Sequence, residues 1–428
     1  MKKFINPAKE TWAELLKRPT FSSDEFEPKV KVILDAVQNE GDKALRQFAQ
    51  QYEGITLDNL QVTDAEFNEA LEILDDDLKS AIKLAALNIE TFHSVQLPKV
   101  VRTETTCGVT CWQKALPIQK VGLYIPGGTA PLFSTVLMLA IPARIAQCPE
   151  VVLCTPVGKD GKVHPAILYV AKLTGVLNVF KVGGAQAIAA MAFGTETIPK
   201  VDKIFGPGNQ WVTTAKQMVS SKGVAIDMPA GPSEVMVVVD ENTPAAFAAA
   251  DLLSQAEHGI DSQVILLAPS EEKLIEIESE TKKQLNLLPR KDIAEKALEH
   301  SRFISFSNSK DAVKFMNQYA PEHLILAVDE PTDWANQVTQ AGSVFLGNYT
   351  PESAGDYASG TNHTLPTNGY ARAYSGVNMD SFMKKITFQQ ITPDGLLNIG
   401  PAIEKMAEAE MLIGHKNAVA IRLKGLKK

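Results

Sequence analysis

Two polar residues near the middle of the chain have the types and spacing of metal ligands. In the stretch LLSQAEHGID (252–261), Gln255 and His258 lie three residues apart. Residues at that spacing face the same way on a helix, so both side chains could point at one centre, such as a metal ion. A solvated helix end just before Gly259 is the other interpretation of this pair taken alone.

A second polar pair stands at the start of an apolar run. In YAPEHL (319–324), Glu322 and His323 lead directly into LILAV. Two ionisable groups at the beginning of a buried strand are poorly explained by packing. A carboxylate beside an imidazole suits general acid–base chemistry, in which one group activates a water and the other moves a proton of the substrate.

Two more stretches could complete a metal site. ESAGDYASGTNHTLPT (352–367) is dense in Gly, Ser and Thr, and it is expected to be a functional loop without secondary structure. It holds Glu352, Asp356, which is a plausible hard ligand, and His363, which could bind an anionic or polar substrate group. EAEMLIGHKNAV (408–419) adds His415 and Glu410, although a lone terminal histidine is usually a cap or a surface group. No HExxH motif is present, so these nitrogen and oxygen ligands suit zinc only if distant segments converge.

The elements that must position these residues follow a repeated strand–turn–helix pattern. Four apolar runs each end in a Gly/Pro turn, and helical segments follow at least three of them: KVGLYIPGG (120–128), EVVLCTP (150–156), NVFKVGG (178–184) and DKIFGPGN (202–209). This repeated pattern predicts a parallel sheet with helical crossovers and with ligands at the carboxyl ends of its strands. EVMVVVD, QVILLAP, RFISFS and HLILAV repeat the pattern after residue 235. The expected fold class is α/β, with two incomplete Rossmann-like parallel-sheet domains, an N-terminal arm and a C-terminal helical tail.

These patterns also predict domain boundaries. Residues 1–21 form the arm, and residues 121–234 an inserted Rossmann-like domain. Residues 22–120 and 235–377 form a discontinuous α/β domain with the metal and catalytic residues, and residues 378–428 form the tail domain. Within these ranges we expect helices in 24–94 with a break at Gly54, an antiparallel ribbon in 100–120, a strand at KKITFQQIT, and helices at 400–412 and 415–423.

The glycine turns allow a nucleotide site without specifying one. No GxGxxG motif occurs, and in GPGNQW (206–211) Trp211 takes the place of the third glycine. Several glycine turns on one sheet edge would let phosphates or a ribose approach backbone amides closely. Each turn taken singly could equally be structural.

Composition excludes several classes of function. The 428-residue chain has a net charge of −8 and no basic block, which argues against nucleic-acid binding. Its N-terminus lacks the apolar core of a signal peptide, and its longest apolar runs are too short to cross a bilayer. We therefore expect a cytoplasmic protein that does not bind membranes. The spacing of its four cysteines matches no metal motif, so we expect free thiols, with Cys154 in the core.

Taken together, these motifs resemble histidinol dehydrogenase, the last enzyme of histidine biosynthesis. The stretches that carry the resemblance occur in the family's order: VGLYIPGGTAPLFSTVLML, VGGAQAIAAMAFGT, FGPGNQWV, DMPAGPSEV, LLSQAEHGIDSQ, YAPEHL, SAGDYASGTNHTLPT and the closing E-x4-H. The resemblance implies a homodimer with one Zn²⁺ per subunit. It implies oxidation of L-histidinol through L-histidinaldehyde to L-histidine, with reduction of two NAD⁺.

The resemblance also implies roles for individual residues. Glu322 and His323 would be the acid–base pair. The zinc ligands would be Gln255, His258, Asp356 and His415. Histidinol would contact these four ligands together with Ser233, His323, His363 and Glu410. The inserted domain of residues 121–234 would bind NAD⁺, which would contact Tyr124, Gln186 and Asn209. In this family His415 and Glu410 are supplied by the partner subunit, so the active sites of the dimer would be shared.

Two other functions remain compatible with the residues themselves. A zinc hydrolase would use Glu322 to activate water and would need no nucleotide. A nucleotide- or amino-acid-binding module would bind its ligand without turnover, which would leave the Glu, His and Asp residues without a purpose. Formation of NADH on addition of histidinol separates both from a dehydrogenase.

Overall fold

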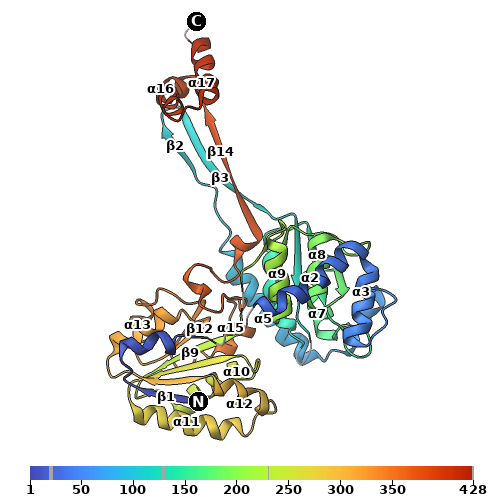
Figure 1. Ribbon diagram of the computed structural model, residues 1–428, viewed down its shortest axis with the longest axis vertical. Helices are drawn as coiled ribbons and strands as arrows, with labels where there is room; N and C mark the ends of the chain where they lie inside the picture. Colours follow the sequence, from blue (N-terminus) through green and yellow to red (C-terminus); the bar gives the residue numbers. More distant parts are fainter. Residues whose placement is uncertain (19–22, 128–130, 230, 427–428) are drawn as a thin grey trace. The chain divides into compact units, whose positions relative to one another are not determined.

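The computed structural model describes residues 1–18, 23–127, 131–229 and 231–426, and its contacts divide the chain into two units. Unit 1 comprises Met1–Gln96 and Ile118–Phe382, and unit 2 comprises Leu97–Pro117 and Met383–Lys428 (Figure 1). No helix in the described ranges is long and apolar enough to cross a membrane. The expected arm reaches residue 21, so its last residues lie outside the described part of the chain.

Unit 1 contains a five-stranded parallel sheet in the order β6-β5-β4-β7-β8. Its strands are β4 (Lys120–Tyr124), β5 (Glu150–Thr155), β6 (Asn178–Lys181), β7 (Lys203–Phe205) and β8 (Ala225–Ile226). The crossover helices are α6 (Phe133–Ile145), α7 (Pro165–Thr174), α8 (Gly184–Phe193) and α9 (Gln210–Ser220). The strand order reverses between β4 and β7, which creates a topological switch point at their carboxyl ends.

The N-terminal helices form an outer layer over this first sheet. They are α2 (Ser23–Glu40), α3 (Asp42–Phe48), the π-helical turn η2 (Ala49–Glu53), α4 (Asp64–Ile73) and α5 (Asp76–Ser94). Helix α2 contacts α8 and α9, α4 contacts α7, and α5 contacts α6 (Figure 1). The expected grouping of residues 22–120 with 235–377 stays a prediction. An amphipathic pattern shows that a helix buries one face, but it does not show which sheet covers that face.

A second parallel sheet in unit 1 has six strands in the order β1-β11-β10-β9-β12-β13. They are β1 (Lys2–Ile5), β9 (Glu234–Val239), β10 (Gln263–Ala268), β11 (Arg302–Ser305), β12 (His323–Ala327) and β13 (Ser343–Leu346). Every residue of β9, β10 and β12 is buried, as expected for strands covered on both faces. The two parallel sheets confirm the expected α/β fold class.

Helices cover both faces of the second sheet. They are α10 (Ala245–Ala256), α11 (Glu271–Leu285), α12 (Lys291–Glu299), α13 (Ser309–Tyr319) and α14 (Pro331–Ala335). Two apolar clusters form its core, one on each face of β9 and β10, because alternate residues of a strand point to opposite sides. The remaining short elements of unit 1 are η1 (Lys9–Thr11), α1 (Trp12–Leu15), α15 (Glu352–Tyr357), η3 (Tyr370–Arg372) and η4 (Met379–Phe382).

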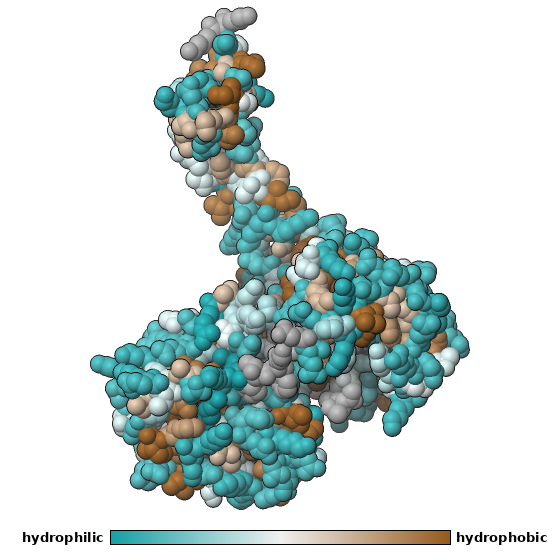
Figure 2. Space-filling view, viewed as in Figure 1, coloured by the Kyte–Doolittle hydropathy of each residue, from teal (hydrophilic) through white to brown (hydrophobic). Residues whose placement is uncertain are grey.

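Unit 2 joins the expected ribbon to the C-terminal tail. Strands β2 (Arg102–Thr106), β3 (Val109–Pro117) and β14 (Met383–Ile391) form an antiparallel sheet in the order β14-β3-β2, followed by α16 (Pro393–Ala409) and α17 (Ile413–Leu426). Helix α16 begins earlier than the expected residue 400. The Thr392 side chain caps it by accepting the N–H of Gly395, and Pro393 suits its first turn. Apolar side chains stay exposed on these helices (Figure 2), among them Met406, Met411 and Ile421.

The cysteines behave as expected. All four are free thiols, and Cys154 is fully buried on β5. Burial raises the pKa of the Cys154 thiol, which makes it an inert core residue.

Candidate active site

The end of α10 places a buried amide beside an exposed imidazole. Gln255 is fully buried, and neither its Oε1 nor its Nε2 has a hydrogen-bond partner among the described residues. His258 follows the helix end, where its backbone N–H donates to the Gln255 carbonyl at 3.2 Å. A buried amide with both polar atoms unpaired is costly, so its retention requires an explanation such as a bound cation.

The segment expected to be a loop contains a helix, and that helix adds a carboxylate to the site. Helix α15 sets Glu352 and Asp356 four residues apart, on one face. Ligand atoms of His258, Glu352 and Asp356 all lie within 4.8 Å of one another. The expectation of a loop without secondary structure is therefore wrong for Glu352–Tyr357. The Gly- and Ser-rich composition hid the ExxxD spacing, which was the one signal that could have singled out Glu352.

Glu352 is a buried carboxyl group without a hydrogen-bond partner among the described residues, and its Oε1 lies 3.8 Å from His323 Nδ1. It is 1% exposed, and no hydrogen bond to either of its oxygens is formed within the described ranges. Burial, followed by the negative charges of Asp356 and Glu322, raises the pKa of Glu352 well above its usual range. A cation beside it would stabilise the ionised form. With His258 and Asp356, Glu352 forms a donor set that fits a divalent metal ion with mixed N and O ligands, and the unpaired amide of Gln255 is a further candidate ligand at the end of α10.

The expected acid–base pair lies at the amino end of β12, and the backbone of Glu234 holds it. Glu322 Oε2 accepts the Glu234 N–H at 2.9 Å. His323 Nδ1 lies 3.3 Å from the Glu234 carbonyl oxygen, so it can donate there as Nδ1–H. That tautomer leaves the lone pair on His323 Nε2, which is buried, unpaired among described residues and 3.8 Å from Asp356 Oδ1. The pair thus adjoins the candidate metal ligands.

Burial shifts the pKa values of this pair in opposite directions. Removal from water lowers the pKa of His323 to about 4, because the charged imidazolium loses its solvation. The same cause raises the pKa of Glu322 well above its usual range. Near neutral pH the imidazole is therefore unprotonated and can accept a proton through Nε2.

His363 lies next to this site with both ring nitrogens engaged. Its Nδ1 lies 3.0 Å from the Asp356 carbonyl oxygen, and its Nε2 lies 3.1 Å from Thr135 Oγ1. Burial lowers its pKa. In this arrangement it supports the backbone of Asp356, and its contact with substrate stays a prediction.

The residues expected to bind NAD⁺ stand at the glycine turns of the first sheet. Tyr124 ends β4, and its hydroxyl accepts the Gly184 N–H at 3.2 Å. Gln186 is buried on α8. Asn209 caps α9 through its Oδ1, which accepts the N–H groups of Trp211 and Val212. All three therefore lie near the carboxyl ends of parallel strands, where ligands of open α/β sheets bind.

One cavity connects the two sheets of unit 1. It has a volume of about 520 Å³, and its lining includes Asn209 from the first sheet and Ser233 and His258 from the second. A nucleotide on the first sheet and a ligand at the metal cluster can therefore approach each other in this cavity.

Two predicted site residues belong to unit 2. His415 is exposed on α17, and Glu410 is exposed at the end of α16. Their expected roles at the metal and the substrate stay predictions.

Gly206→Ala is expected to lower the free energy of unfolding by more than the 1–3 kcal/mol typical of a strained backbone. Gly206 has φ +124°, and a Cβ there would lie 2.0 Å from the Tyr124 carbonyl oxygen. Gly223→Ala is the matched control, because Gly223 also has positive φ (+94°) but no atom within 4 Å of its Cβ position. Urea unfolding of both variants measures the difference. Equal losses would show that the close approach to Tyr124 contributes nothing.

Comparison with known proteins identifies the family. The family model of histidinol dehydrogenase matches residues 16–423. The histidinol dehydrogenase of Bacteroides thetaiotaomicron is 59% identical over 427 residues, which cover 100% of both chains. The crystal structure of histidinol dehydrogenase from Elizabethkingia anophelis matches with a TM-score of 0.98 and 54% identity, and covers 100% of this chain and 99% of that one. The chain belongs to the histidinol dehydrogenase family.

Membership in this family confirms the expected enzyme class, an oxidoreductase of histidine biosynthesis. The fold extends beyond the family. An acetylating aldehyde dehydrogenase from Geobacillus thermoglucosidasius matches with a TM-score of 0.50 and 17% identity over 89% of this chain and 94% of that one, a likeness of fold alone.

Proposed function

We propose that this chain oxidises L-histidinol through L-histidinaldehyde to L-histidine, with a zinc ion at the cluster and two NAD⁺ reduced per turnover. The observation that carries the proposal is that buried polar atoms of Gln255, Glu352 and His323 have no hydrogen-bond partner among the described residues, while Glu352 lies close to His258 and Asp356. Such a set is costly in a purely structural role and fits a site built for a cation and a polar substrate.

In this proposal Gln255, His258 and Asp356 hold zinc together with His415. When bound, zinc supplies a Lewis acid that binds substrate nitrogen or oxygen atoms and orients the alcohol carbon. A carboxylate oxygen of Glu352 lies within 4.8 Å of the ligand atoms of His258 and Asp356, so a cation held there would favour the ionised form of Glu352. Ser233, His363 and Glu410 are the further substrate contacts. NAD⁺, when bound at Tyr124, Gln186 and Asn209, supplies the acceptor for the hydride.

His323 takes the proton in the first oxidation. The alcohol carbon loses its hydrogen as hydride to NAD⁺, and the hydroxyl proton passes to His323 Nε2, which gives the aldehyde. Nε2 suits this step because the Glu234 carbonyl holds the Nδ1–H and burial keeps the imidazole neutral.

Glu322 prepares the second oxidation. Water adds to the aldehyde carbon: its oxygen forms the new bond, one of its protons passes to the Glu322 carboxylate, and the former carbonyl oxygen takes the proton that His323 Nε2 received in the first oxidation, which leaves His323 neutral again. The resulting diol carries an alcohol group again, so the same hydride and proton transfers give the carboxylic acid. The Glu234 N–H holds Glu322 in place for this task, and a nearby cation favours its ionised form.

The proposal includes a homodimer with shared active sites. His415 and Glu410 would then act in the site of the neighbouring subunit. The exposed apolar residues on α16 and α17 support this arrangement, because a second copy would remove them from water. The predicted domain boundaries, a cytoplasmic location and the absence of nucleic-acid and membrane partners stay predictions.

The proposed function is tested by adding L-histidinol and NAD⁺ to the purified zinc-loaded protein. We expect absorbance at 340 nm from NADH, with two NADH formed per L-histidine, and loss of activity on chelation followed by recovery with zinc. A zinc hydrolase or a binding module would form no NADH. One NADH per substrate, with histidinaldehyde released, would contradict the two-step oxidation.

A further inference from the structure

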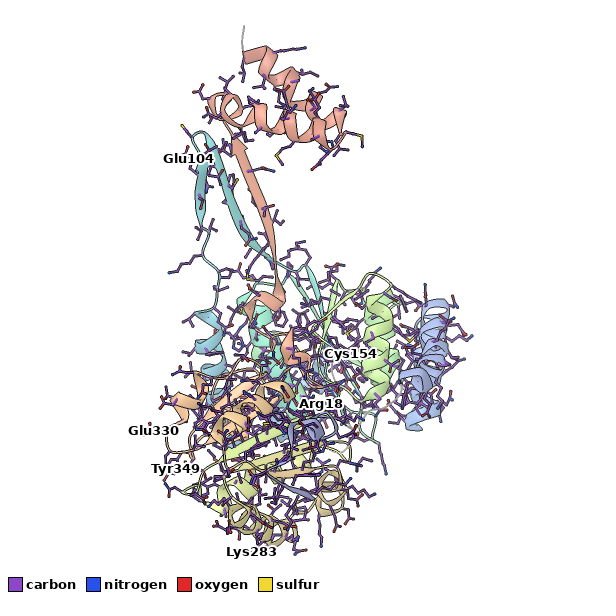
Figure 3. All side chains as sticks on the ribbon, turned by 60° about the vertical axis from the view of Figure 1, so that its left-hand side comes forward. Arg18, Glu104, Cys154, Lys283, Glu330 and Tyr349 are labelled. Atoms are coloured by element: carbon purple, nitrogen blue, oxygen red, sulfur yellow. The ribbon has the colours of Figure 1, made fainter. Side chains whose placement is uncertain are left out.

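A buried ion pair joins the N-terminal arm to the start of β9. Arg18 Nε donates to Glu234 Oε2 at 2.5 Å, and Arg18 Nη2 donates to Glu234 Oε1 at 2.9 Å. The side chains are only 9% and 3% exposed. Figure 3 shows Arg18 inside unit 1, whereas the labelled Lys283 and Glu330 lie at its periphery. The two-pronged contact is specific to a guanidinium, since a lysine has one point charge.

The same guanidinium also holds the turn that leads to the acid–base pair. Arg18 Nη2 donates to the carbonyl oxygens of Tyr319 at 2.7 Å and Ala320 at 3.3 Å, and the Arg18 Cζ lies 3.8 Å from the centroid of the Tyr319 ring. Ala320 has φ +54°, an unfavourable conformation for a residue with a side chain. The charged donor therefore stabilises a strained peptide two residues before Glu322.

Tyr319 closes the network on the other side of Glu234. Its buried hydroxyl lies 3.0 Å from Glu234 Oε2 and 2.8 Å from Gln263 Oε1. Glu234 is thus held by Arg18 and by Tyr319, and its position along β9 and its side-chain rotamer are both fixed.

Stability alone does not account for this network. The free energy needed to move two charges out of water is about as large as the free energy gained from their attraction. Replacing a buried ion pair by apolar residues is therefore often neutral or stabilising. The distinguishing feature of this pair is its location. The backbone of Glu234 holds both members of the acid–base pair, through its N–H to Glu322 and its carbonyl to His323 Nδ1.

We propose that Arg18 and Glu234 are positioning residues for the oxidation of histidinol. The ion pair fixes the Glu234 backbone and the 319–321 turn together, and these in turn fix the Glu322 carboxylate and the reactive tautomer of His323. The inference rests on the proposed function, and it adds that the N-terminal arm determines the geometry of the catalytic pair.

The test is the single-turnover rate constant of the first hydride transfer in full-length, zinc-loaded enzyme. NADH formation is followed by stopped flow, with enzyme in excess over histidinol. Its amplitude reports the histidinol that is oxidised, and at saturating enzyme the rate constant does not depend on how much enzyme folds. We expect Glu234→Gln, which keeps the shape and removes the charge, to lower the rate constant about tenfold to a hundredfold, as small misplacements of catalytic groups do. Zinc content and the KM for histidinol are expected to change little.

Two further variants separate positioning from stability. Arg18→Lys keeps the charge but loses the two-pronged contact, so we expect a smaller decrease in the same direction. Lys273→Met removes another buried cation, on helix α11 against the second sheet. Its side chain is 5% exposed and donates to the Glu241 carbonyl, beyond the carboxyl end of β9. This variant is expected to lose stability and to keep the wild-type rate constant.

The outcomes are distinct. Wild-type rate constants in Glu234→Gln and Arg18→Lys would overturn the positioning role while wild-type turnover upholds the proposed function. If the rate constant fell as much in Lys273→Met as in Glu234→Gln, the effect would be one of general destabilisation, and the inference would also be overturned. No NADH from the wild-type protein would remove the proposed function, and the positioning role with it.

Discussion

Glu322→Gln is expected to slow the oxidation of added L-histidinaldehyde by about a hundredfold or more, as loss of a general base does, while the oxidation of L-histidinol slows much less. The amide cannot take a proton from water. It can still accept the Glu234 N–H through its remaining oxygen, so His323 keeps its neighbours. Single-turnover measurements of NADH formation, started from the alcohol and from the aldehyde with the same preparation, give both rates.

His323→Gln is the matched comparison, since His323 is expected to accept a proton in both oxidations. Both half-reactions should slow together in that variant, and zinc content should report whether the neighbouring Asp356 still binds metal. Equal slowing of both half-reactions in Glu322→Gln would contradict a separate role for Glu322 in activating water.

The sequence predicted the parallel sheets well because their signals are local. An apolar run followed by a glycine turn and a helical segment has few structural alternatives, and β4, β6 and β7 end at the expected turns. Strand β1 was not predicted. A four-residue strand with mostly exposed side chains has no burial pattern, and it forms only because the edge of β11 is available for pairing.

The partners of the elements were less predictable than the elements themselves. The antiparallel ribbon and the strand at KKITFQQIT were both expected, but nothing in either pattern indicated that β14 pairs with β3 along its full length. Likewise, the helices in 24–94 were predicted, whereas their packing against the first sheet was not. Alternation and periodicity report which face of an element is buried, and the covering surface depends on the whole chain.

In the candidate site, too, features with a local signal were predicted and long-range contacts were not. Glu322 and His323 stood out because ionisable groups at the start of a buried strand conflict with packing, and the structure brings them beside Asp356. Glu352 was noted in the expected loop but given no role, because composition favoured a loop over α15. The Arg18–Glu234 pair joins residues 216 positions apart, and no local pattern links an arginine in the arm to a strand that far along the chain.

His258→Asn is expected to bind no zinc after dialysis and to lose nearly all activity while its fold is kept. The shorter amide cannot reach the place of the imidazole nitrogen, and His258 is exposed, so the replacement leaves no cavity in the core. Metal analysis, activity and urea unfolding are measured together. His164→Asn is the control, because exposed His164 caps α7 through its Nδ1 and asparagine caps helices as well. Full zinc content and normal turnover in His258→Asn would refute the ligand assignment.

Mixing His258→Asn with His415→Asn tests whether the active sites are shared. Each variant alone is expected to be inactive. If His415 acts in the site of the neighbouring subunit, a mixed dimer places both substitutions in one site and leaves the other site intact. Random exchange of subunits then restores about a quarter of the wild-type activity, since half of the dimers are mixed and each has one working site. If each subunit builds its own site, every site carries a substitution and mixing restores nothing. Recovery after denaturation and joint refolding, measured as NADH formation against a mixture that was never unfolded, distinguishes the two arrangements.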